Sequence, residues 1–205
     1  MTADQGAAPT PIVVPANEAS WDDIRAVFGT HGDPAGCACQ WFKFQRRDWR
    51  ALSRQQRTEL LREQTNCDHP ETSTTSGLVA YLGEDPAGWC AIEPRSEYVR
   101  LLSARIPWAG RNESKDDDGV WAVTCFVTRV GFRRRGVGRA LAEATVSYAK
   151  ERGASAVEGY PIVVEPDQVF TWGELFVGSW TMFADAGYRE VSRPTARRAV
   201  MRIDF

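Results

Sequence analysis

Residues 120–153 read VWAVTCFVTRVGFRRRGVGRALAEATVSYAKERG, and this stretch decides the fold. The first part, 120–127, is an apolar run typical of a strand that is covered on both faces of its sheet. After a turn rich in arginine and glycine, apolar side chains recur at helical spacing, at Val137, Leu141, Ala144 and Tyr148. The pattern therefore predicts a buried strand, a turn, and a helix over 137–152 that Gly153 ends.

A second strand is predicted at 156–164, immediately after that helix. Two strands joined by a helix in this way lie parallel, so the segment 120–164 forms a βαβ crossover. The remaining elements follow from capping residues and alternating apolar runs. They are a strand at 12–14, helices at 21–28 and 54–64, a hairpin of 78–82 and 87–93 with a connection longer than two residues, helices at 97–104 and 179–186, and a closing antiparallel pair at 188–191 and 199–203.

The turn between strand and helix has the composition of an anion site. Gly136 and Gly138 lack a Cβ, so the backbone can curl closely around a ligand and direct amide groups toward it at the positive end of the helix dipole. Four arginines, at 133, 134, 135 and 139, could add charge-assisted bonds to further phosphate oxygens. A pyrophosphate fits this description.

The turn has three other interpretations. An exposed basic loop with two turn glycines is the simplest, but the strand before it and the helix after it favour a binding turn. A Walker P-loop is excluded because no Gly-Lys-Ser/Thr sequence follows. A Rossmann site is disfavoured because the third glycine of its fingerprint is missing and the strand is not N-terminal.

Residues 123–154 resemble motif A of the GNAT superfamily of acetyl-CoA-dependent N-acetyltransferases, whose pattern is Q/R-x-x-G-x-G/A. Arg133, Gly136 and Gly138 fill that pattern, and the resemblance, which extends over roughly residues 77–205, is to one bacterial subgroup. It implies an α/β (α+β) fold with a mixed sheet of about seven strands, splayed between the fourth and fifth, and helices on both faces. Acetyl-CoA would lie in the V-shaped gap. The resemblance places pantetheine contacts at Phe126 and Val127 and pyrophosphate contacts at Arg134, Arg135, Gly136, Val137, Gly138 and Arg139.

The chain as a whole is consistent with one domain. It has 205 residues, 43% of them hydrophobic, and a net charge of −2, which does not indicate a general nucleic-acid-binding protein. Residues 1–11 are predicted to be a flexible tail and 12–205 a single acetyltransferase domain. No stretch is long and apolar enough for a membrane span, and the five scattered cysteines suggest reduced thiols. We expect a cytoplasmic protein, a monomer or homodimer, with neither a nucleic acid nor a membrane as partner.

Acetyl transfer to an amine depends chiefly on positioning, together with a base for the amine and an acid for the thiolate. Many GNAT members carry the acid as a tyrosine four residues before the glycine that ends the fourth helix, and this chain has Phe183 there. Tyr160, Tyr188, a water molecule or a thiol stay open as substitutes. For the base, Glu158 and Tyr160 project from one strand face, and Glu158 is the better candidate of the two. The alternative, that Glu158 is a solvated or salt-bridged strand carboxylate, has the larger weight because most acidic residues on strands are of that kind.

The cysteines permit two further hypotheses, neither of which is preferred. Cys125 is expected to be a core cysteine rather than a nucleophile. Cys37, Cys39, Cys67 and His69 resemble a zinc ligand set, but their spacing is unusual, so no metal is expected.

The predicted function is acetyl transfer from acetyl-CoA to a primary amine of a small molecule. A non-catalytic acyl-CoA-binding or sensing module, suggested by Phe183, is the first alternative. A protein- or aminoacyl-tRNA-directed acetyltransferase is the second, and it would need a basic acceptor face. The acceptor itself is not legible in the sequence, because variable loops select it.

Overall fold

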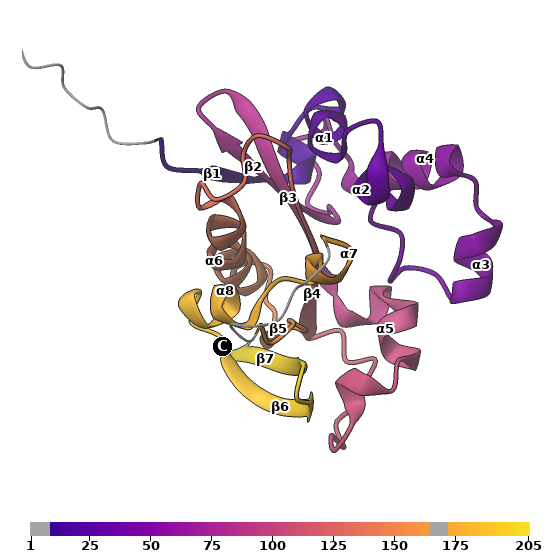
Figure 1. The fold of residues 1–205 in the computed structure, drawn as a ribbon, viewed down its shortest axis with the longest axis vertical. Helices are drawn as coiled ribbons and strands as arrows, with labels where there is room; N and C mark the ends of the chain where they lie inside the picture. The colour runs from indigo at the N-terminus through magenta and orange to yellow at the C-terminus, as the bar shows by residue number, and fades with distance from the viewer. Residues whose placement is uncertain (1–8, 165–171) are drawn as a thin grey trace, which may run out of the picture.

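The computed structural model describes residues 9–164 and 172–205, whose strands form one mixed seven-stranded sheet (Figure 1). The strand order is β1-β2-β3-β4-β5-β7-β6, and every neighbouring pair is antiparallel except β4 and β5. The predicted mixed α/β fold is thereby confirmed. The strands are β1 (Ile12–Pro15), β2 (Gly77–Leu82), β3 (Asp85–Pro94), β4 (Val120–Thr128), β5 (Ala156–Gly159), β6 (Arg189–Thr195) and β7 (Arg198–Asp204).

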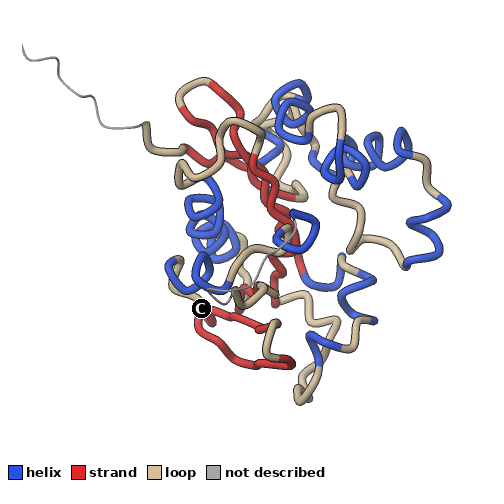
Figure 2. The backbone as a smooth tube through the Cα atoms, in the orientation of Figure 1, coloured by secondary structure: helices blue, strands red, loops and turns tan. Residues whose placement is uncertain are grey.

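Helices cover both faces of the sheet, as Figures 1 and 2 show. The longest is α6, which connects the parallel strands β4 and β5 and packs on β2 to β5, with α8 beside it. The α-helices are α1 (Trp21–Phe28), α2 (Gly32–Cys37), α3 (Arg46–Ala51), α4 (Arg54–Thr65), α5 (Val99–Ser103), α6 (Val137–Glu151), α7 (Trp172–Leu175) and α8 (Trp180–Asp185). Within the described residues, short 3-10 helices lie at η1 (Ala16–Glu18), η2 (Arg95–Glu97) and η3 (Ile106–Trp108). No helix of the described chain is both long and apolar enough to cross a bilayer.

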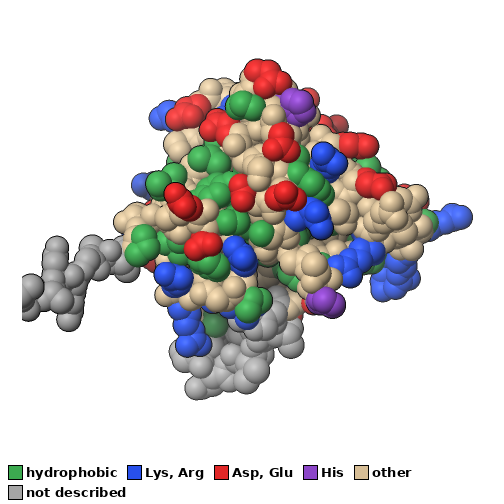
Figure 3. Space-filling model, turned by 90° about the horizontal axis from the view of Figure 1, so that it is seen from above, with side chains coloured by type: hydrophobic (Ala, Val, Ile, Leu, Met, Phe, Trp, Pro, Cys, Tyr) green, Lys and Arg blue, Asp and Glu red, His purple; other side chains and the backbone are tan. Residues whose placement is uncertain are grey.

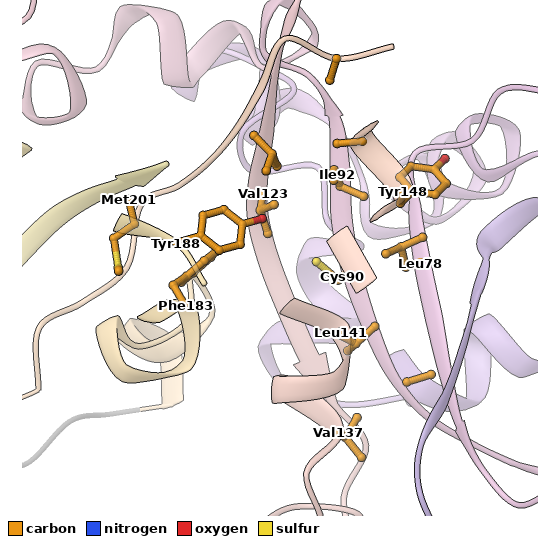
Figure 4. Close-up of a cluster of buried hydrophobic side chains, with 14 of the residues drawn as sticks. Leu78, Cys90, Ile92, Val123, Val137, Leu141, Tyr148, Phe183, Tyr188 and Met201 are labelled. Carbon is orange, nitrogen blue, oxygen red and sulfur yellow. The ribbon is translucent and has the colours of Figure 1, made fainter. Parts of the chain in front are cut away.

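Strand β4 separates two hydrophobic clusters, which explains its apolar sequence. On the α6 side, Val123 packs with Leu141 of α6 and with Phe183 and Tyr188 (Figure 4). On the other side, Val127 packs with Trp89 and the residues of α1. Burial on both faces is what the unbroken apolar run predicted, and it makes β4 the rigid centre of the sheet.

The parallel pair is short, and the sheet opens beyond it. β4 and β5 pair only from Val120 with Ala156 to Val123 with Gly159. Thr124, the next residue of β4, is an extra residue in the register with β3, because Ile92 pairs with Val123 and Ala91 with Cys125. We call the region beyond Val123 and Gly159 the sheet opening. A bulge of this kind turns a strand away from its neighbour, and sheets carry such bulges next to functional sites.

Several boundaries differ from the prediction. The β2–β3 connection was expected to exceed two residues, but Leu82 pairs with Asp85, so that prediction was wrong and the turn contains only residues 83 and 84. The strand predicted at 156–164 ends at Gly159, because Pro161 has no amide proton for the ladder. Helices α2 and α3 were not predicted from the sequence, and in α2 glycine and proline obscure the helical periodicity. Most of the predicted tail, residues 1–8, lies outside the described residues.

Candidate active site

The N-terminus of α6 follows the turn after β4 and has the geometry of an anion site. Its N-cap is Gly136, with φ +79°, and no side chain caps the helix. Ala140 donates the first intrahelical bond, to the Gly136 carbonyl, so the amides of Val137, Gly138 and Arg139 precede it and have no helical acceptor. Helices α1, α4 and α8 are each capped by a serine side chain instead. The first-turn amides of α6 are thus left for an external acceptor.

The arginines of the turn surround this site with exposed positive charge. Arg133, Arg134 and Arg135 are all exposed, and Arg134 adopts a left-handed conformation with φ +60°. Arg135 lies 5.4 Å from the centre of the Phe132 ring. Arg139 forms an ion pair with Glu143 at 2.7 Å, and the hydrogen bond and charge of Glu143 raise its pKa. The Arg139 side chain therefore already has a partner on the surface of α6, whereas the first-turn backbone amides have no acceptor within that helix.

Val137 fixes the distance between α6 and the sheet, and Gly88 of β3 makes that distance short. A Cβ on Gly88 would lie 2.4 Å from Val137 Cγ1, so only glycine permits this approach. Val137 itself is buried in the core below α6 (Figure 4). Its predicted role at the pyrophosphate can involve only its amide. The role of Gly88 was missed in the sequence, where it was placed in the predicted strand 87–93 without a close approach to a helix.

The edge of β4 in the sheet opening presents backbone groups away from β3. Phe126 donates its amide to Phe176 O at 2.6 Å, so Phe126 points toward the opening. Arg129 donates to Ala87 of β3, and by the alternation of an antiparallel strand Val127 also faces β3 while Thr128 faces the opening. Of the two residues predicted to meet pantetheine, Phe126 has the required orientation and Val127 does not. Thr128 shares the orientation of Phe126.

Phe176 belongs to a segment that lies across the sheet opening, between β4 and the chain that continues β5. The segment bonds to β4 through the Phe176 carbonyl. It bonds to the chain beyond β5 through Ile162, which donates to Gly178 O at 3.0 Å and accepts from the amide of Trp180 at 2.8 Å. The Phe176 ring packs 6.0 Å from that of Phe42. Figure 1 shows α7, which precedes this segment, beside β4. The segment was not predicted, because nothing in its sequence indicates where it docks.

A buried polar group lies at the bulge of β4 on the face opposite α6. The hydroxyl of Tyr98 is buried and has no partner at hydrogen-bond geometry, while Thr124 and Glu93 are its polar neighbours. Glu93 forms an ion pair with Lys43 at 2.5 Å, and both side chains are nearly inaccessible. Burial raises the pKa of Glu93, with the charge of Lys43 opposing it. Burial, reinforced by the charge of Glu93, likewise raises the pKa of Tyr98 well above its usual range.

Glu158, the predicted base, lies at the centre of a fully buried ion cluster. One carboxylate oxygen accepts from Arg111 and from Arg202, the latter at 2.8 Å. The other accepts from Arg95 and Arg111, each at 3.3 Å, and from the hydroxyl of Tyr160 at 2.9 Å. The lone pairs of the carboxylate are thus engaged, and its side chain has no exposed surface. A general base needs a lone pair within reach of the substrate, which this arrangement does not offer.

The hydroxyls of two other tyrosines considered in the sequence are engaged as well. Tyr160 donates to Glu158, and burial together with the charge of Glu158 raises its pKa well above the usual range. The Tyr188 hydroxyl pairs with Thr145 of α6 at 2.6 Å, inside the core. Phe183 occupies the position of the usual acid, fully buried between the rings of Phe126 and Tyr188. Tyr98 was missed because its sequence position, between η2 and α5, does not indicate proximity to β4.

The cysteines form no metal site among residues 9–164 and 172–205, where no three metal-ligating side chains of His, Cys, Asp and Glu gather. Cys39 accepts from the indole of Trp89 at 3.3 Å, and His69 pairs with Glu71. Cys125 packs against the cluster on the α1 side. The hydrogen bond from Cys39 and burial raise the pKa of the Cys125 thiol well above its usual range, so it lacks the thiolate character of a nucleophile.

Comparisons with known proteins agree with this geometry. A family model described as "Acetyltransferase (GNAT) family" matches residues 32–166. No curated protein sequence matches the chain. Among solved structures, an N-acetyltransferase from Staphylococcus aureus Mu50 is similar with a TM-score of 0.51 at 9% identity, covering 95% of this chain and 98% of that one. At such identity the likeness concerns the fold.

Two further structures are similar over nearly the whole chain. A GCN5-related N-acetyltransferase from Kribbella flavida has 18% identity and a TM-score of 0.48, with coverage of 95% of this chain and 98% of that one. The PaiA N-acetyltransferase from Thermoplasma acidophilum, in complex with coenzyme A, has 11% identity and a TM-score of 0.46, with coverage of 96% and 99%.

Proposed function

The chain belongs to the GNAT acetyltransferase family, and on that premise we propose that it transfers the acetyl group of acetyl-CoA to a primary amine of a small molecule. The proposed reaction is direct attack in a ternary complex. The observation that carries the proposal is the uncapped N-terminus of α6 at the end of β4, next to a β4 edge that does not pair with β5. An extended strand edge that is followed along the chain by an anion site matches a cosubstrate with an extended amide arm and a pyrophosphate.

Different residues would bind different parts of acetyl-CoA. The amides of Val137, Gly138 and Arg139 would hold the pyrophosphate, and the exposed arginines at 133, 134 and 135 would add charge. Phe126 and Thr128 would pair with the amide arm, in exchange for the Phe176 carbonyl that Phe126 now binds. Acetyl-CoA supplies an activated thioester, so the protein needs to orient it and to move protons.

For the proton we assign Tyr98 rather than Glu158. The Tyr98 hydroxyl is buried without a partner, beside Thr124 at the bulge where the sheet opens. In the proposed step, the amine nitrogen bonds to the thioester carbonyl carbon and gives a proton to the Tyr98 oxygen while the Tyr98 proton passes to the Glu93 carboxylate. The carbon–sulfur bond then breaks, and the CoA thiolate takes a proton from Tyr98, which Glu93 reprotonates. A carboxylate whose pKa burial has raised is a suitable acceptor near neutral pH. Glu158 and Tyr160, the candidates that the sequence suggests, are proposed instead to anchor the chain around Arg95 and Arg111.

The experiment that tests this function compares two substitutions at one position. Gly138→Pro deletes one first-turn amide, whereas Gly138→Ala keeps it and adds only a methyl group, 3.2 Å from the flexible sulfur of Met182. We expect Gly138→Pro to abolish acetyl-CoA binding measured by calorimetry, as Gly136→Pro should. We expect Gly138→Ala to retain it, and Arg134→Ala merely to weaken it.

Two other results would redirect the proposal. If Arg134→Ala abolished binding while Gly138→Pro did not, the backbone account of the pyrophosphate site would be refuted. If acetyl-CoA bound tightly but no amine in a broad panel released free CoA, the chain would be the non-catalytic acyl-CoA-binding module. Acetylation of a protein or an aminoacyl-tRNA in place of small amines would identify the remaining alternative.

A further inference from the structure

Arginine and tryptophan side chains form a stacked cluster where α3, α4 and α5 meet. The Arg100 guanidinium lies 3.7 Å from the ring centre of Trp41, and that of Arg57 lies 4.3 Å from Trp49. The two indole rings meet edge to face at 5.1 Å. Arg46 and Arg50 of α3 are close enough that their charges act on Arg100. We call these residues the Arg–Trp cluster: Trp41, Trp49, Arg46, Arg50, Arg57 and Arg100.

The positive charge of the Arg–Trp cluster is not compensated. None of its four arginines forms an ion pair within the described residues. Burial, together with the charges of Arg46 and Arg50, lowers the pKa of Arg100. Residues 43–62 contain seven basic and two acidic side chains, although the whole chain has a net charge of −2. Figure 3 shows Lys and Arg side chains gathered at its right-hand margin, the side on which α3 lies in Figure 1.

Two guanidinium nitrogens of the cluster are also buried without a partner, Nη2 of Arg100 and Nε of Arg57. Elsewhere the chain contains stacked arginines that need no ligand, such as Arg62 over Trp21. The Arg–Trp cluster differs because like charges converge on donors that are shielded from water. An unsatisfied donor of this kind is costly, and an anion would remove the cost.

The Arg–Trp cluster borders the sheet opening on the face opposite α6. Its Trp41 precedes Phe42, whose carbonyl accepts from the Arg100 amide at 3.0 Å. Phe42 packs against the hydrophobic cluster that contains Tyr98 and Tyr160, and its ring lies 6.0 Å from that of Phe176, whose carbonyl accepts from the Phe126 amide. A ligand bound at Arg100 would therefore lie next to the residues that cover the bulge of β4.

We propose that the Arg–Trp cluster binds an anionic group of the acceptor, so that the preferred substrates are amines that carry a carboxylate or a phosphate. This inference rests on the proposed function for the transfer step. Arg100 donates through Nε to Phe44 O and Arg57 through Nη1 to Trp49 O, but Nη2 of Arg100 and Nε of Arg57 keep donors without a partner. Such guanidinium donors match the oxygens of a carboxylate or phosphate. The indoles hold the guanidinium groups in place, so less conformational entropy is lost when the anion binds.

The first test uses amines matched in everything except charge. Rates of CoA release are compared for γ-aminobutyrate and γ-aminobutyramide, and for O-phosphoethanolamine and ethanolamine. We expect kcat/KM for one acidic member to exceed that of its neutral partner at least about tenfold, and the advantage to shrink with added salt. The pair that shows the advantage distinguishes carboxylate from phosphate. Equal kcat/KM within both pairs overturns the inference and leaves acetyl transfer intact.

The second test removes the charge with a matched control. Arg50 is exposed and contributes no capping bond, so Arg50→Gln should fold normally. We expect Arg50→Gln to raise KM for the acidic amine about five- to tenfold, and Arg100→Gln to raise it more, with KM for acetyl-CoA unchanged. Arg62→Gln removes a stacked arginine outside the cluster and should change neither. An equal effect of all three variants would contradict a specific site.

Direct binding separates this inference from the proposed function. The acidic amine that performs best, or each acidic amine in turn if none reacts, is titrated into the protein by calorimetry with CoA present. Binding that Arg50→Gln weakens supports the Arg–Trp cluster even when no acetyl transfer occurs, in which case only the proposed function fails. Absence of binding by both acidic amines overturns the cluster as an anion site.

Discussion

Substituting Glu158 by glutamine separates the two roles that its position permits, base or anchor. The change keeps the size and one carbonyl oxygen but removes the negative charge on which Arg95, Arg111 and Arg202 converge. Arg95 has no exposed side-chain surface, so water cannot hydrate its guanidinium in place of the lost carboxylate. Glu113, 2.8 Å from Arg95 and also paired with Arg111, would remain as partial compensation.

The magnitude follows from that geometry. Removing one member of a buried ion cluster costs about 3–5 kcal/mol, and the remaining Glu113 favours the lower end, about 3 kcal/mol. For a chain of this size each kcal/mol shifts Tm by roughly 2–4 °C, so we expect Glu158→Gln to lower Tm by about 6–12 °C. Differential scanning calorimetry measures the shift. Turnover measured well below the new Tm should stay within a few-fold of the wild-type kcat.

Glu190→Gln is the matched control, because Glu190 also accepts from an arginine and a second donor but lies at the surface. We expect it to cost at most about 1 kcal/mol. The reasoning about Glu158 is refuted if Glu158→Gln leaves Tm within about 2 °C of the wild type while kcat falls about 100-fold or more. That combination would identify Glu158 as the base and would require its side chain to leave the arginines during turnover.

Three further predictions concern the core, the proton and a thiol. Gly159→Ala should lower the free energy of unfolding by about 2–3 kcal/mol in urea titrations, because a Cβ there would lie 2.2 Å from the buried Phe183 ring; Gly36→Ala, with open space around it, should cost nothing. Tyr98→Phe should lower kcat about 100-fold with little change in Tm, since its hydroxyl has no partner to lose. If Tyr160→Phe lowered kcat in this way and Tyr98→Phe did not, the proton transfer would be assigned to Tyr160. Cys37, whose pKa burial raises to about 11, should be alkylated at pH 8 about 100-fold more slowly than in the denatured chain, where mass spectrometry should show all five cysteines reacting; equal rates would contradict the raised pKa.

The features that local chemistry determines could be predicted from the sequence. The capping box of Ser53 and Gln56 marks the start of α4, and Ser20 marks that of α1, because each cap satisfies amides only a few residues away. The βαβ crossover followed from two periodicities in consecutive segments, and the structure confirms it. Gly136 was correctly placed at the start of α6, since a glycine after an arginine-rich turn permits its positive φ.

Features that depend on long-range contacts could not be predicted. Glu158 looked like a strand carboxylate, and its three arginines come from η2, from the segment that follows η3 and from β7, which no sequence spacing brings together. Tyr98 approaches Thr124 only because the 3-10 turn η2 directs the chain back across β4. The direction of the Val127 backbone groups, toward β3, depends on the bulge at Thr124. One extra residue in β4 reverses which of the following amides point toward β3 and which point away from it.

The sheet opening itself depends on three residues, and they indicate where acetyl-CoA affinity must come from. The bulge at Thr124 diverts β4, Gly159 admits the Phe183 ring beneath β5, and Pro161 removes the next ladder donor. The β4 edge thus loses its neighbour, but Phe176 already satisfies the amide of Phe126 at 2.6 Å. An amide arm that displaces Phe176 exchanges one backbone bond for another, which yields a net free energy near zero. The affinity must then arise mainly at the first turn of α6, where no acceptor among the described residues competes for the amides, and this is why Gly138→Pro should cost more binding than any substitution along β4.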